Sequence, residues 1–527
     1  MKHLFILAII LVSIGSIAQN NIRFRDMLGY PVQLSSLWGY ADTANSKEYA
    51  LVGTYNGLSI VDVTNPDSVY EVQFISGPSS TWREVKTWSH YAYATNETSD
   101  GLLIVDLSSL PAAVNSIYWT AGAENLSTGH TLFIDNNGYL YVNGFNVPGK
   151  TLPTDMRGVL MADLNANPMN PTVVGKVQGK YVHDSFTRND TLWTANIYNG
   201  IFQVYDVSNK ANPILLADQQ TPNSYTHNCW LSDDGNVLFT TDEKGSAFIT
   251  SYDVSNLGNI TELDRYQSEP GSGLIPHNVH VVGRYLVNAY YKAGVTIADA
   301  QDPANIIEVG NYDTSPFLSE DGFAGTWGVY PYLPSGTILT SDMEEGLFVL
   351  TPTYTPACYL QGVITNQSNG APLSNVNVQI VGNDNFDLTN FNGEYATGVR
   401  DAGFYDVRVS QSGCASNIIA GVKLQHDSIT VLNATIDCVV GINDLLDDNA
   451  FIKTYYSAGE TVMAYSTGEF IGNATLEVYT VQGALVRSIN IPSGKGTVKL
   501  DEGFSSGMYL LDLQMGGTHL NHKMLKP

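Results

Sequence analysis

The stretch GLSIVDVTNP, residues 57–66, returns in altered form six more times along this chain. The other copies are GLLIVDLSSLP from Gly101, GVLMADLNANP from Gly158, GIFQVYDVSNKANP from Gly200, AFITSYDVSN from Ala247, GVTIADAQDP from Gly294 and GLFVLTP from Gly346. Most copies are an apolar, β-rich run followed by Asp and a turn of Asn, Ser or Pro. The first four copies start 44, 57 and 42 residues apart. A repeat of that length with about four strand patterns predicts one four-stranded propeller blade.

Seven such units predict a closed ring. In the fifth unit, THNCWLSD, NVLFTTDE, AFITSYDV and NITELDRY give four consecutive strand patterns, whereas the seventh has three and ends at GLFVLTP. We predict that NIRFRDML, residues 21–28, supplies the missing strand, because an open edge strand is an aggregation hazard. The predicted fold is therefore all-β: a seven-bladed β-propeller followed by two small β-sandwich domains.

The first strands of the seven units share an aligned aromatic position. The fragments are SLWGY, TWREV, GHTLF, VHDSF, THNCW, PHNVH and TWGVY. The aligned residues are Trp38, Trp82, His130, His183, His227, His277 and Trp327. Because the first strand of a propeller blade lines the central channel, we expect these side chains at a common height near one channel mouth. Trp38, Trp82 and Trp327 would complete a ring around that mouth.

The arc of four histidines admits two interpretations. In the first, His130, His183, His227 and His277 bind a metal, since neutral imidazoles are good ligands for zinc, copper or iron. Carboxylates are near in sequence; they are Asp184, Asp242, Glu243 and Asp342. In the second, each histidine holds strands together by hydrogen bonds. Tryptophan at the same position in three units favours the structural interpretation, and blades spread around a channel could hold the histidines too far apart for one ion.

Composition limits the partners and the redox chemistry. The formal charge is −26 at pH 7, which argues against nucleic acid as a ligand. The four cysteines are Cys229, Cys358, Cys414 and Cys438. We predict a disulfide between Cys358 and Cys438, which flank the C-terminal group of three, and a buried free thiol at Cys229.

The N-terminus predicts export. MKHLFILAIILVSIGSIAQ has a basic start, an apolar run and small residues before Ala18, which is the pattern of a secretory signal peptide cleaved after that residue. No later apolar run approaches the length of a transmembrane span. We therefore expect an extracellular protein or one displayed on the outer-membrane surface.

Three regions resemble known families. The IVDV…NP units, with THN, TTDEKG, IPHNV and TWGVYPYLPSG, resemble the LVIVD-repeat propellers of secreted bacterial proteins called choice-of-anchor B. That resemblance implies a fold and an exported protein, but no catalytic residues. The stretch CYLQGVITNQSNGAPLSNVNVQIVG, with the hairpin FNGEY, resembles the carboxypeptidase regulatory-like domain, a transthyretin-type β-sandwich that implies a spacer or binding module.

The C-terminus gives the third resemblance. ATLEVYTVQGALVRS, GFSSGMYLLDLQMGG and the basic end HKMLKP resemble the C-terminal sorting domain of type IX secretion substrates in Bacteroidetes. It implies that the secretion machinery is a partner and that the sorting domain is removed. The predicted organisation is a signal peptide (1–18), the propeller (19–355), the regulatory-like domain (356–440), a linker (441–450) and the sorting domain (451–527).

Two classes of function stay open. The sequence has no G-x-S-x-G, H-E-x-x-H, P-loop or C-x-x-C motif, and this favours a monomeric binding or scaffold protein with a glycan or protein ligand over an enzyme. The alternative is a secreted, metal-dependent hydrolase or lyase that acts on polysaccharide or peptide at the channel. The sequence does not establish a cofactor, and a divalent metal is the candidate. Zinc at the histidines is one option; calcium at GNDNFD, from Gly382, is another, although a solvated loop explains that stretch better.

Overall fold

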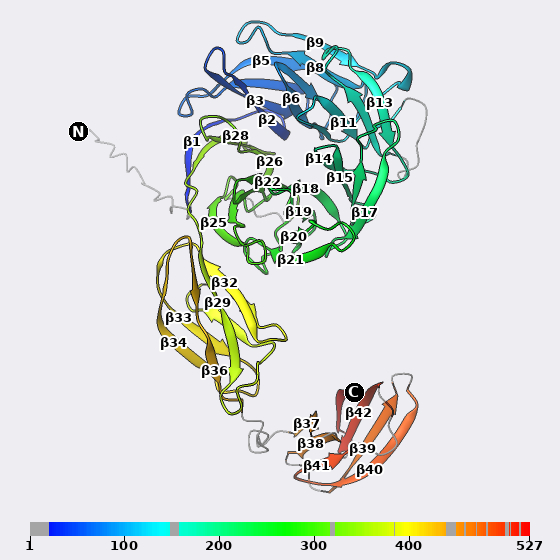
Figure 1. Ribbon diagram of the computed structural model, residues 1–527, viewed down its shortest axis with the longest axis vertical. Coiled ribbons are helices and arrows are strands. Elements are labelled where there is room, and N and C mark those ends of the chain that lie inside the picture. The colour runs from blue at the N-terminus through cyan, green and yellow to red at the C-terminus, as the bar shows by residue number, and fades with distance from the viewer. Residues whose placement is uncertain are drawn as a thin grey trace, which may run out of the picture.

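Seven four-stranded antiparallel sheets form a closed ring in the computed structural model of the chain (Figure 1). The structure describes residues 20–147, 157–316, 322–383, 385–438 and 450–526, apart from 458–459, 469, 471, 481–482, 501–504, 506 and 516–517. The predicted signal peptide and all but the last residue of the predicted linker lie outside the described residues. The prediction of an all-β propeller followed by sandwich domains is confirmed.

Each of the first six blades uses four consecutive strands, and the innermost comes first in the chain. Blades 1 and 2 consist of β2 (Leu34–Asp42), β3 (Lys47–Thr54), β4 (Gly57–Asp62) and β5 (Tyr70–Ser76), then β6 (Val85–Trp88), β7 (Tyr91–Ala94), β8 (Leu102–Asp106) and β9 (Asn115–Trp119). A short 3-10 helix, η1 (Gly122–Glu124), follows. Blades 3 and 4 consist of β10 (Leu132–Ile134), β11 (Tyr139–Asn143), β12 (Val159–Asp163) and β13 (Thr172–Val177), then β14 (Asp184–Arg188), β15 (Thr191–Asn196), β16 (Ile201–Asp206) and β17 (Ile214–Gln220).

The later blades follow the same order. Blades 5 and 6 consist of β18 (Thr226–Leu231), β19 (Val237–Asp242), β20 (Ile249–Asp253) and β21 (Thr261–Tyr266), then β22 (Asn278–Val282), β23 (Tyr285–Ala289), β24 (Val295–Asp299) and β25 (Ile307–Tyr312). Blade 7 consists of β26 (Thr326–Tyr330), β27 (Ile338–Asp342), β28 (Gly346–Pro352) and, as its outer strand, β1 (Ile22–Leu28).

The N-terminal strand closes the ring, as predicted from NIRFRDML. β1 runs antiparallel to β28, with Ile22 opposite Pro352 and Leu28 opposite Leu347 (Figure 1). Ile22 is buried in the cluster that joins blades 6 and 7. The last blade thus combines strands from both ends of the propeller sequence, which leaves β28 without an open edge.

The repeated Asp after each apolar run fastens a turn. Asp62 Oδ1 accepts a hydrogen bond of 2.9 Å from the backbone N–H of Thr64, two residues on. The same bond recurs in the next five blades, at Asp106, Asp163, Asp206, Asp253 and Asp299. The run before it is buried on both faces; every residue of β4 is buried, since each blade packs against two neighbours. The repeat in the sequence therefore encodes a buried third strand and the Asx turn that ends it.

A β-sandwich follows the propeller, built from two four-stranded sheets. Its strands are β29 (Cys358–Asn366), β30 (Asn377–Ile380), β31 (Phe386–Leu388), β32 (Glu394–Val399), β33 (Gly403–Ser410), β34 (Asn417–Leu424), β35 (Ser428–Val431) and β36 (Ala434–Ile436). It contacts blade 6, where Asp299 Oδ2 accepts the N–H of Ala357 at 2.8 Å and pairs with Arg284, which also reaches Asp427.

The cysteines differ in part from the prediction. Cys414 and Cys438 form the disulfide, and the predicted Cys358–Cys438 pair is wrong. Cys358 lies in the buried sandwich core as a free thiol. Cys229 is a buried free thiol, as predicted.

The last part of the chain forms two further sheets around a core of its own. Its strands are β37 (Ala450–Ser457), β38 (Glu460–Thr467), β39 (Asn473–Thr480), β40 (Leu485–Pro492), β41 (Lys495–Lys499), β42 (Gly507–Met515) and β43 (Thr518–Lys526). Among the residues that the structure describes, no helix has the length and hydropathy needed to cross a membrane.

Candidate functional site at the channel mouth

Six of the seven aligned aromatic residues line one cavity at the channel. They are Trp82, His130, His183, His227, His277 and Trp327. The empty space between these side chains, part of which is open to solvent, is about 300 Å³. Arg83, Glu84, Thr131, Asp184 and Asn278 complete its lining.

Trp38 lies elsewhere, which corrects the predicted ring. The register of β2 against β3 shifts between Leu34 and Leu37. The carbonyl of Ser35 accepts a hydrogen bond of 2.6 Å from Ser341 Oγ of blade 7. In other blades, the carbonyl of a histidine accepts the corresponding bond from the preceding blade. Ser35 therefore occupies the position of the histidines, and Trp38 lies three residues beyond it. Trp38 lines a second, deeper cavity. The irregularity in β2 hides this offset from a sequence alignment.

Hydrogen bonds between blades fix the backbone at the histidines. Thr95 Oγ1 donates to the carbonyl of His130 at 2.9 Å, Thr131 Oγ1 to that of His183 at 2.6 Å, and Thr241 Oγ1 to that of His277 at 2.6 Å. In each case the donor belongs to the preceding blade. The rings consequently project from an anchored backbone, which limits how far the mouth can rearrange.

The four imidazole rings form a continuous arc. Ring centroids are 4.1 Å apart for His130 and His183, 4.2 Å for His183 and His227, and 4.3 Å for His227 and His277. Rings on four successive blades are thus in contact. The spread of the blades does not keep adjacent histidines apart, which answers the geometric objection to a shared ligand.

One end of the arc is held by a carboxylate. Glu97 Oε1 lies 2.6 Å from His130 Nδ1, and His130 Nε2 lies 2.7 Å from His183 Nε2. At the other end, His277 Nδ1 donates to the carbonyl of Trp327. The structural interpretation, in which each histidine ties strands together, thus describes His130 and His277 well.

The middle of the arc is different. Among the described residues, His183 Nδ1 and His227 Nδ1 are buried and make no well-formed hydrogen bond, although each ring faces the backbone of the next histidine along the arc. The nearest carboxylate is Glu243, whose Oε2 lies 3.8 Å from His227 Nε2 and whose Oε1 lies 3.7 Å from His277 Nε2. Tyr291 Oη donates to Glu243 Oε1 at 2.5 Å. One ligand atom from each of His183, His227 and Glu243 lies within 4.8 Å of the others.

Burial controls the charge of this cluster. It lowers the pKa of His183 and of His227 well below the ordinary value, and the neighbouring imidazoles lower both further. Burial lowers the pKa of His277 to about 3. It also raises the pKa of the Glu243 carboxyl to about 7, against the hydrogen bond from Tyr291. At neutral pH these three rings are therefore uncharged and keep a lone pair for a ligand.

Of the carboxylates that the sequence placed near the arc, Glu243 approaches the rings. Asp242 instead accepts hydrogen bonds from Thr221 Oγ1 and from the N–H of Asn223 and of Tyr225. Asp342 likewise accepts bonds from Thr314, between blades 6 and 7, and from the N–H of Glu344 in its own blade. These two carboxylates therefore stabilise loops instead of facing a ligand.

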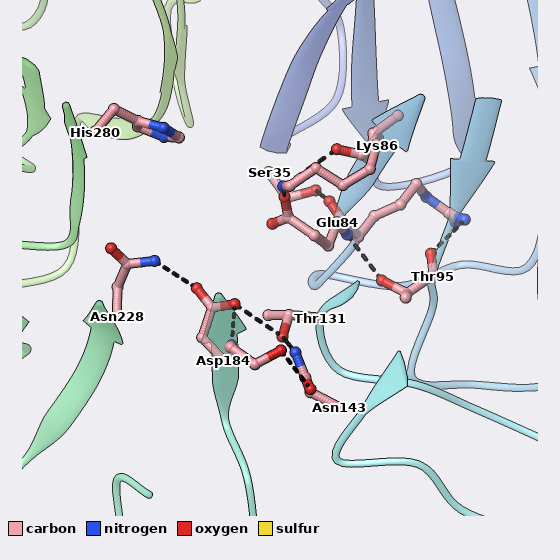
Figure 2. Close-up of polar contacts among 12 residues, drawn as sticks. Ser35, Glu84, Lys86, Thr95, Thr131, Asn143, Asp184, Asn228 and His280 are labelled. Atoms are coloured by element: carbon pink, nitrogen blue, oxygen red, sulfur yellow. Dashed lines mark hydrogen bonds and ion pairs between the residues drawn. The ribbon is translucent and has the colours of Figure 1, made fainter. Parts of the chain in front are cut away.

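The residue after each histidine faces the inside of the channel. Asn228 Nδ2 donates to Asp184 Oδ2 at 2.6 Å, and Asn228 Oδ1 accepts the N–H of Val279 at 3.1 Å, so Asn228 joins blades 4, 5 and 6 (Figure 2). Burial, and then the nearby Glu84, raise the pKa of Asp184 to about 6. The His-Asx pairs therefore place a ring at the mouth and an inter-blade tie just below it.

Below these ties lies the second cavity. Lys86 pairs with Glu84 (Figure 2). Its Nζ lies 4.2 Å from the ring centroid of Trp38. His280 faces this cavity and contacts Trp230 at 4.6 Å between ring centroids. Burial lowers the pKa of His280 to about 3, and Lys86 adds to the effect. Glu84, Asp184 and Asn278 line both cavities, which makes them neighbours within one channel.

Sequence reasoning did not identify Glu97 or Lys86 as part of the channel. Glu97 follows the second strand of its own blade but reaches the histidine of the next, and Lys86 lies in the short strand β6. Position gave a partial signal: Trp230 and His280 each lie three residues after an aligned histidine, and Lys86 lies four residues after the aligned Trp82.

Comparisons with known proteins identify two of the three regions. Residues 41–74 and 276–314 match the LVIVD repeat, and residues 359–437 match the carboxypeptidase regulatory-like domain, which confirms the predicted repeats and the predicted regulatory-like domain. No curated protein matches the chain. Among solved structures, the chain is similar to a crystal structure described as the Myceliophteria thermophila Cps50 (Swd1) beta-propeller domain, with 11% identity and a TM-score of 0.44 over 62% of this chain and 99% of that one.

Proposed function

We propose that the chain is an exported binding protein that takes up its ligand at the histidine-lined mouth of the propeller. The chain carries LVIVD repeats on a propeller fold, which fits a binding or scaffold module. The regulatory-like sandwich follows as a spacer docked on blade 6. The mouth, rather than the outer wall of the ring, is where polar and aromatic groups converge.

The observation that carries this proposal is an exposed aromatic rim around the buried histidines. Trp82 is 43% exposed and lies 6.4 Å from His130 between ring centroids. Tyr198 is 65% exposed, and its ring centroid lies 4.9 Å from that of Tyr181, which lies near His130 and His183. Aromatic faces beside a polar cavity suit a ligand with one flat or apolar face and one polar group.

Export through the type IX pathway is part of the proposal. Its support is the signal-peptide pattern of residues 1–18 and the sorting-domain motifs in 451–527. The strongly acidic composition is compatible with an extracellular, monomeric protein that binds a glycan or a protein.

Binding to glycan and peptide arrays tests the proposed function. We expect the full chain to give a defined set of positive features, and Trp82→Ala and Tyr198→Ala to reduce that signal at least tenfold. Tyr70→Ala is the matched control, because Tyr70 is a comparably exposed aromatic residue on the outer strand β5. Equal signal from the rim variants and from the wild type would overturn the assignment of the mouth as the binding site.

A second candidate function is hydrolysis of a small substrate at the same mouth. It is favoured by the convergence of His183, His227 and Glu243, since two imidazoles and a carboxylate are the donor set of several hydrolytic metal centres. A panel of chromogenic esters, phosphate esters and glycosides, assayed with and without added Zn²⁺, tests it. Turnover that requires the metal and is lost in His227→Ala would establish this function, and no turnover would exclude it for those substrate classes.

A further inference from the structure

We propose that His183, His227 and Glu243 bind one divalent transition-metal ion at the channel mouth. The inference rests on the proposed binding function of the mouth and names the ion that would act there. One ligand atom from each residue lies within 4.8 Å of the others, and all three side chains are largely buried. They come from blades 4 and 5, whose backbones are anchored at the channel.

The contacts of the arc leave one side of the His183 ring without a strong hydrogen bond. Glu97 is an acceptor, so His130 Nδ1 carries the proton that faces it at 2.6 Å. One further proton lies in the 2.7 Å contact between His130 Nε2 and His183 Nε2. The remaining nitrogen, His183 Nδ1, is buried and makes no well-formed hydrogen bond to a described residue, although the ring faces the backbone of His227.

The nitrogens of His227 give a second argument for a bound ion. Its Nδ1 is also buried without a well-formed hydrogen bond among the described residues, although the ring faces the backbone of His277, and its Nε2 has a carboxylate oxygen at 3.8 Å, beyond hydrogen-bond distance. A buried imidazole with no hydrogen bond is costly to the fold, and buried polar atoms that lack a partner call for an explanation. A bound ion between His183, His227 and Glu243 supplies one.

The neighbours of these three residues act as supporting groups. Metal-bound histidines generally donate their other N–H to an acceptor that orients the ring. For His183 the group in contact with that nitrogen is His130, itself oriented by Glu97. Tyr291 Oη donates to Glu243 Oε1 at 2.5 Å and thereby fixes the carboxylate. Glu97 and Tyr291 are therefore positioning residues rather than ligands.

The donor set selects the class of ion. Calcium takes six to eight oxygen ligands, so two imidazole nitrogens disfavour it, whereas imidazole suits zinc, copper, iron and nickel. Bonds of about 2.0–2.2 Å place two ligands of one ion no more than about 4.3 Å apart. The three ligand atoms lie within 4.8 Å of one another, so the widest pair must close by about half an ångström. Three protein ligands leave a coordination position open for water or for an added ligand.

The charge around the site does not oppose a cation. Arg83 lines the same cavity, but its guanidinium is engaged by backbone carbonyls: Nε donates to Thr54, Nη1 to Thr95 and Nη2 to Pro78. Glu97 and Glu243 flank the arc, and Glu84 and Asp184 line the cavity. Among the described residues that line this cavity, two carry a carboxyl group and one, Arg83, carries a cationic side chain.

Titration calorimetry of the chelator-treated full chain with ZnCl₂ tests the inference. We expect one ion per chain, and at least a hundredfold weaker binding for His227→Ala and for Glu243→Gln. Glu97→Gln should weaken binding about 10–100-fold through the orientation of His130 and His183. His280→Phe is the matched control, because His280 is an equally buried channel histidine outside the cluster, and it should bind as the wild type does.

A second measurement covers the case in which a variant fails to fold. Co²⁺ bound to the wild type should give the intense visible absorption of a four- or five-coordinate nitrogen and oxygen site. A wild type that binds neither ion at the mouth, or a folded His227→Ala that binds Zn²⁺ unchanged, would overturn the inference. If Zn²⁺ does not bind but Trp82→Ala still loses its array signal, the metal site is wrong and the binding function stands. If Zn²⁺ binds as predicted and the rim variants keep their signal, the proposed function fails alone.

Discussion

At the scale of single residues, the His-Asx pairs of blades 4, 5 and 6 combine two roles. The histidine presents its ring to the mouth, and the next residue faces the channel interior, because successive side chains of a strand point to opposite sides. Asn228 uses its inward position to bridge Asp184 and Val279. The recurrence of these pairs in the sequence therefore reflects a cavity-lining position and a packing position side by side.

Replacing Asn228 tests the packing role. Asn228→Ala leaves the Asp184 carboxyl and the Val279 N–H without their partner, and should destabilise the propeller by about 1–3 kcal/mol for each group left unpaired. Asn278→Ala is the control, since Asn278 Oδ1 at the equivalent position has no partner to lose. Urea denaturation followed by tryptophan fluorescence measures the difference. Equal losses in the two variants would contradict the bridging role.

His280 gives a prediction for pH. Its folded pKa of about 3 lies below the unfolded value, so the unfolded chain takes up a proton that the folded chain does not. The stability that neutral His280 confers is complete above about pH 6.5 and declines as the pH falls towards 3. Lys86, which lowers this pKa further, and Tyr332, 3.5 Å from His280 Nδ1, face the ring; Glu84 and Asp184 line the same cavity.

The comparison is between the wild type and His280→Phe, which keeps an aromatic ring beside Trp230. Between pH 6 and 4.5 the wild type should lose stability relative to the variant by about 1.4 kcal/mol per pH unit. Denaturant titrations at several pH values give this slope. If the difference in unfolding free energy between the two proteins stays constant from pH 6 to 4.5, His280 has the same pKa in the folded and in the unfolded chain.

At the scale of elements, ring closure depends on one strand from the other end of the propeller. β1 pairs with β28 along its length, with a shift of register between Phe24 and Asp26. Phe24 contacts Tyr312 of blade 6 and Phe348 of β28. The strand therefore covers the edge of blade 7 and also connects it to blade 6.

Removing β1 tests this closure. A chain that begins at Gly29 should lose thermal stability strongly and associate through the exposed edge of β28, whereas a chain that begins at Asn20 keeps β1 and serves as the control. Melting curves and size-exclusion chromatography report both effects. Identical melting temperatures and elution volumes for the two chains would mean that the ring closes without β1.

Much of the element structure was predictable from sequence, and the exceptions have local causes. The blades follow from the buried third strands and their Asx turns, which recur with a readable spacing. Trp38 was misplaced because an irregularity at Leu34–Leu37 shifts β2, and no residue type marks that shift. The disulfide partner of Cys438 depends on which loop of the sandwich reaches it, which spacing does not reveal. Glu97 meets His130 only because two blades pack side by side.

At the scale of the whole molecule, three β domains follow one another along the chain (Figure 1). Only the first carries the histidine arc, and the second packs on blade 6 through Asp299 and Arg284. The proposed export route assigns the third domain to secretion alone. The mature binding protein would then consist of the propeller and the regulatory-like sandwich.

Mass spectrometry of the secreted protein tests this division. When the chain is produced in a bacterium with a type IX secretion pathway, the mature form should begin near Gln19 and lack the region after about Gly441. A variant truncated after Val440 should accumulate inside the cell, because it lacks the sorting signal. A mature extracellular protein with its C-terminus intact would contradict the assignment.

The central claim is that the channel mouth holds a metal ion between two neighbouring blades. The most direct measurement is an anomalous difference map, recorded at the zinc absorption edge, from crystals of the full chain soaked in Zn²⁺. The account predicts one strong peak at about 2.0–2.2 Å from a ring nitrogen of His183, a ring nitrogen of His227 and a carboxylate oxygen of Glu243. A mouth without a peak at saturating zinc, or zinc bound only to exposed histidines such as His90 and His519, would contradict it.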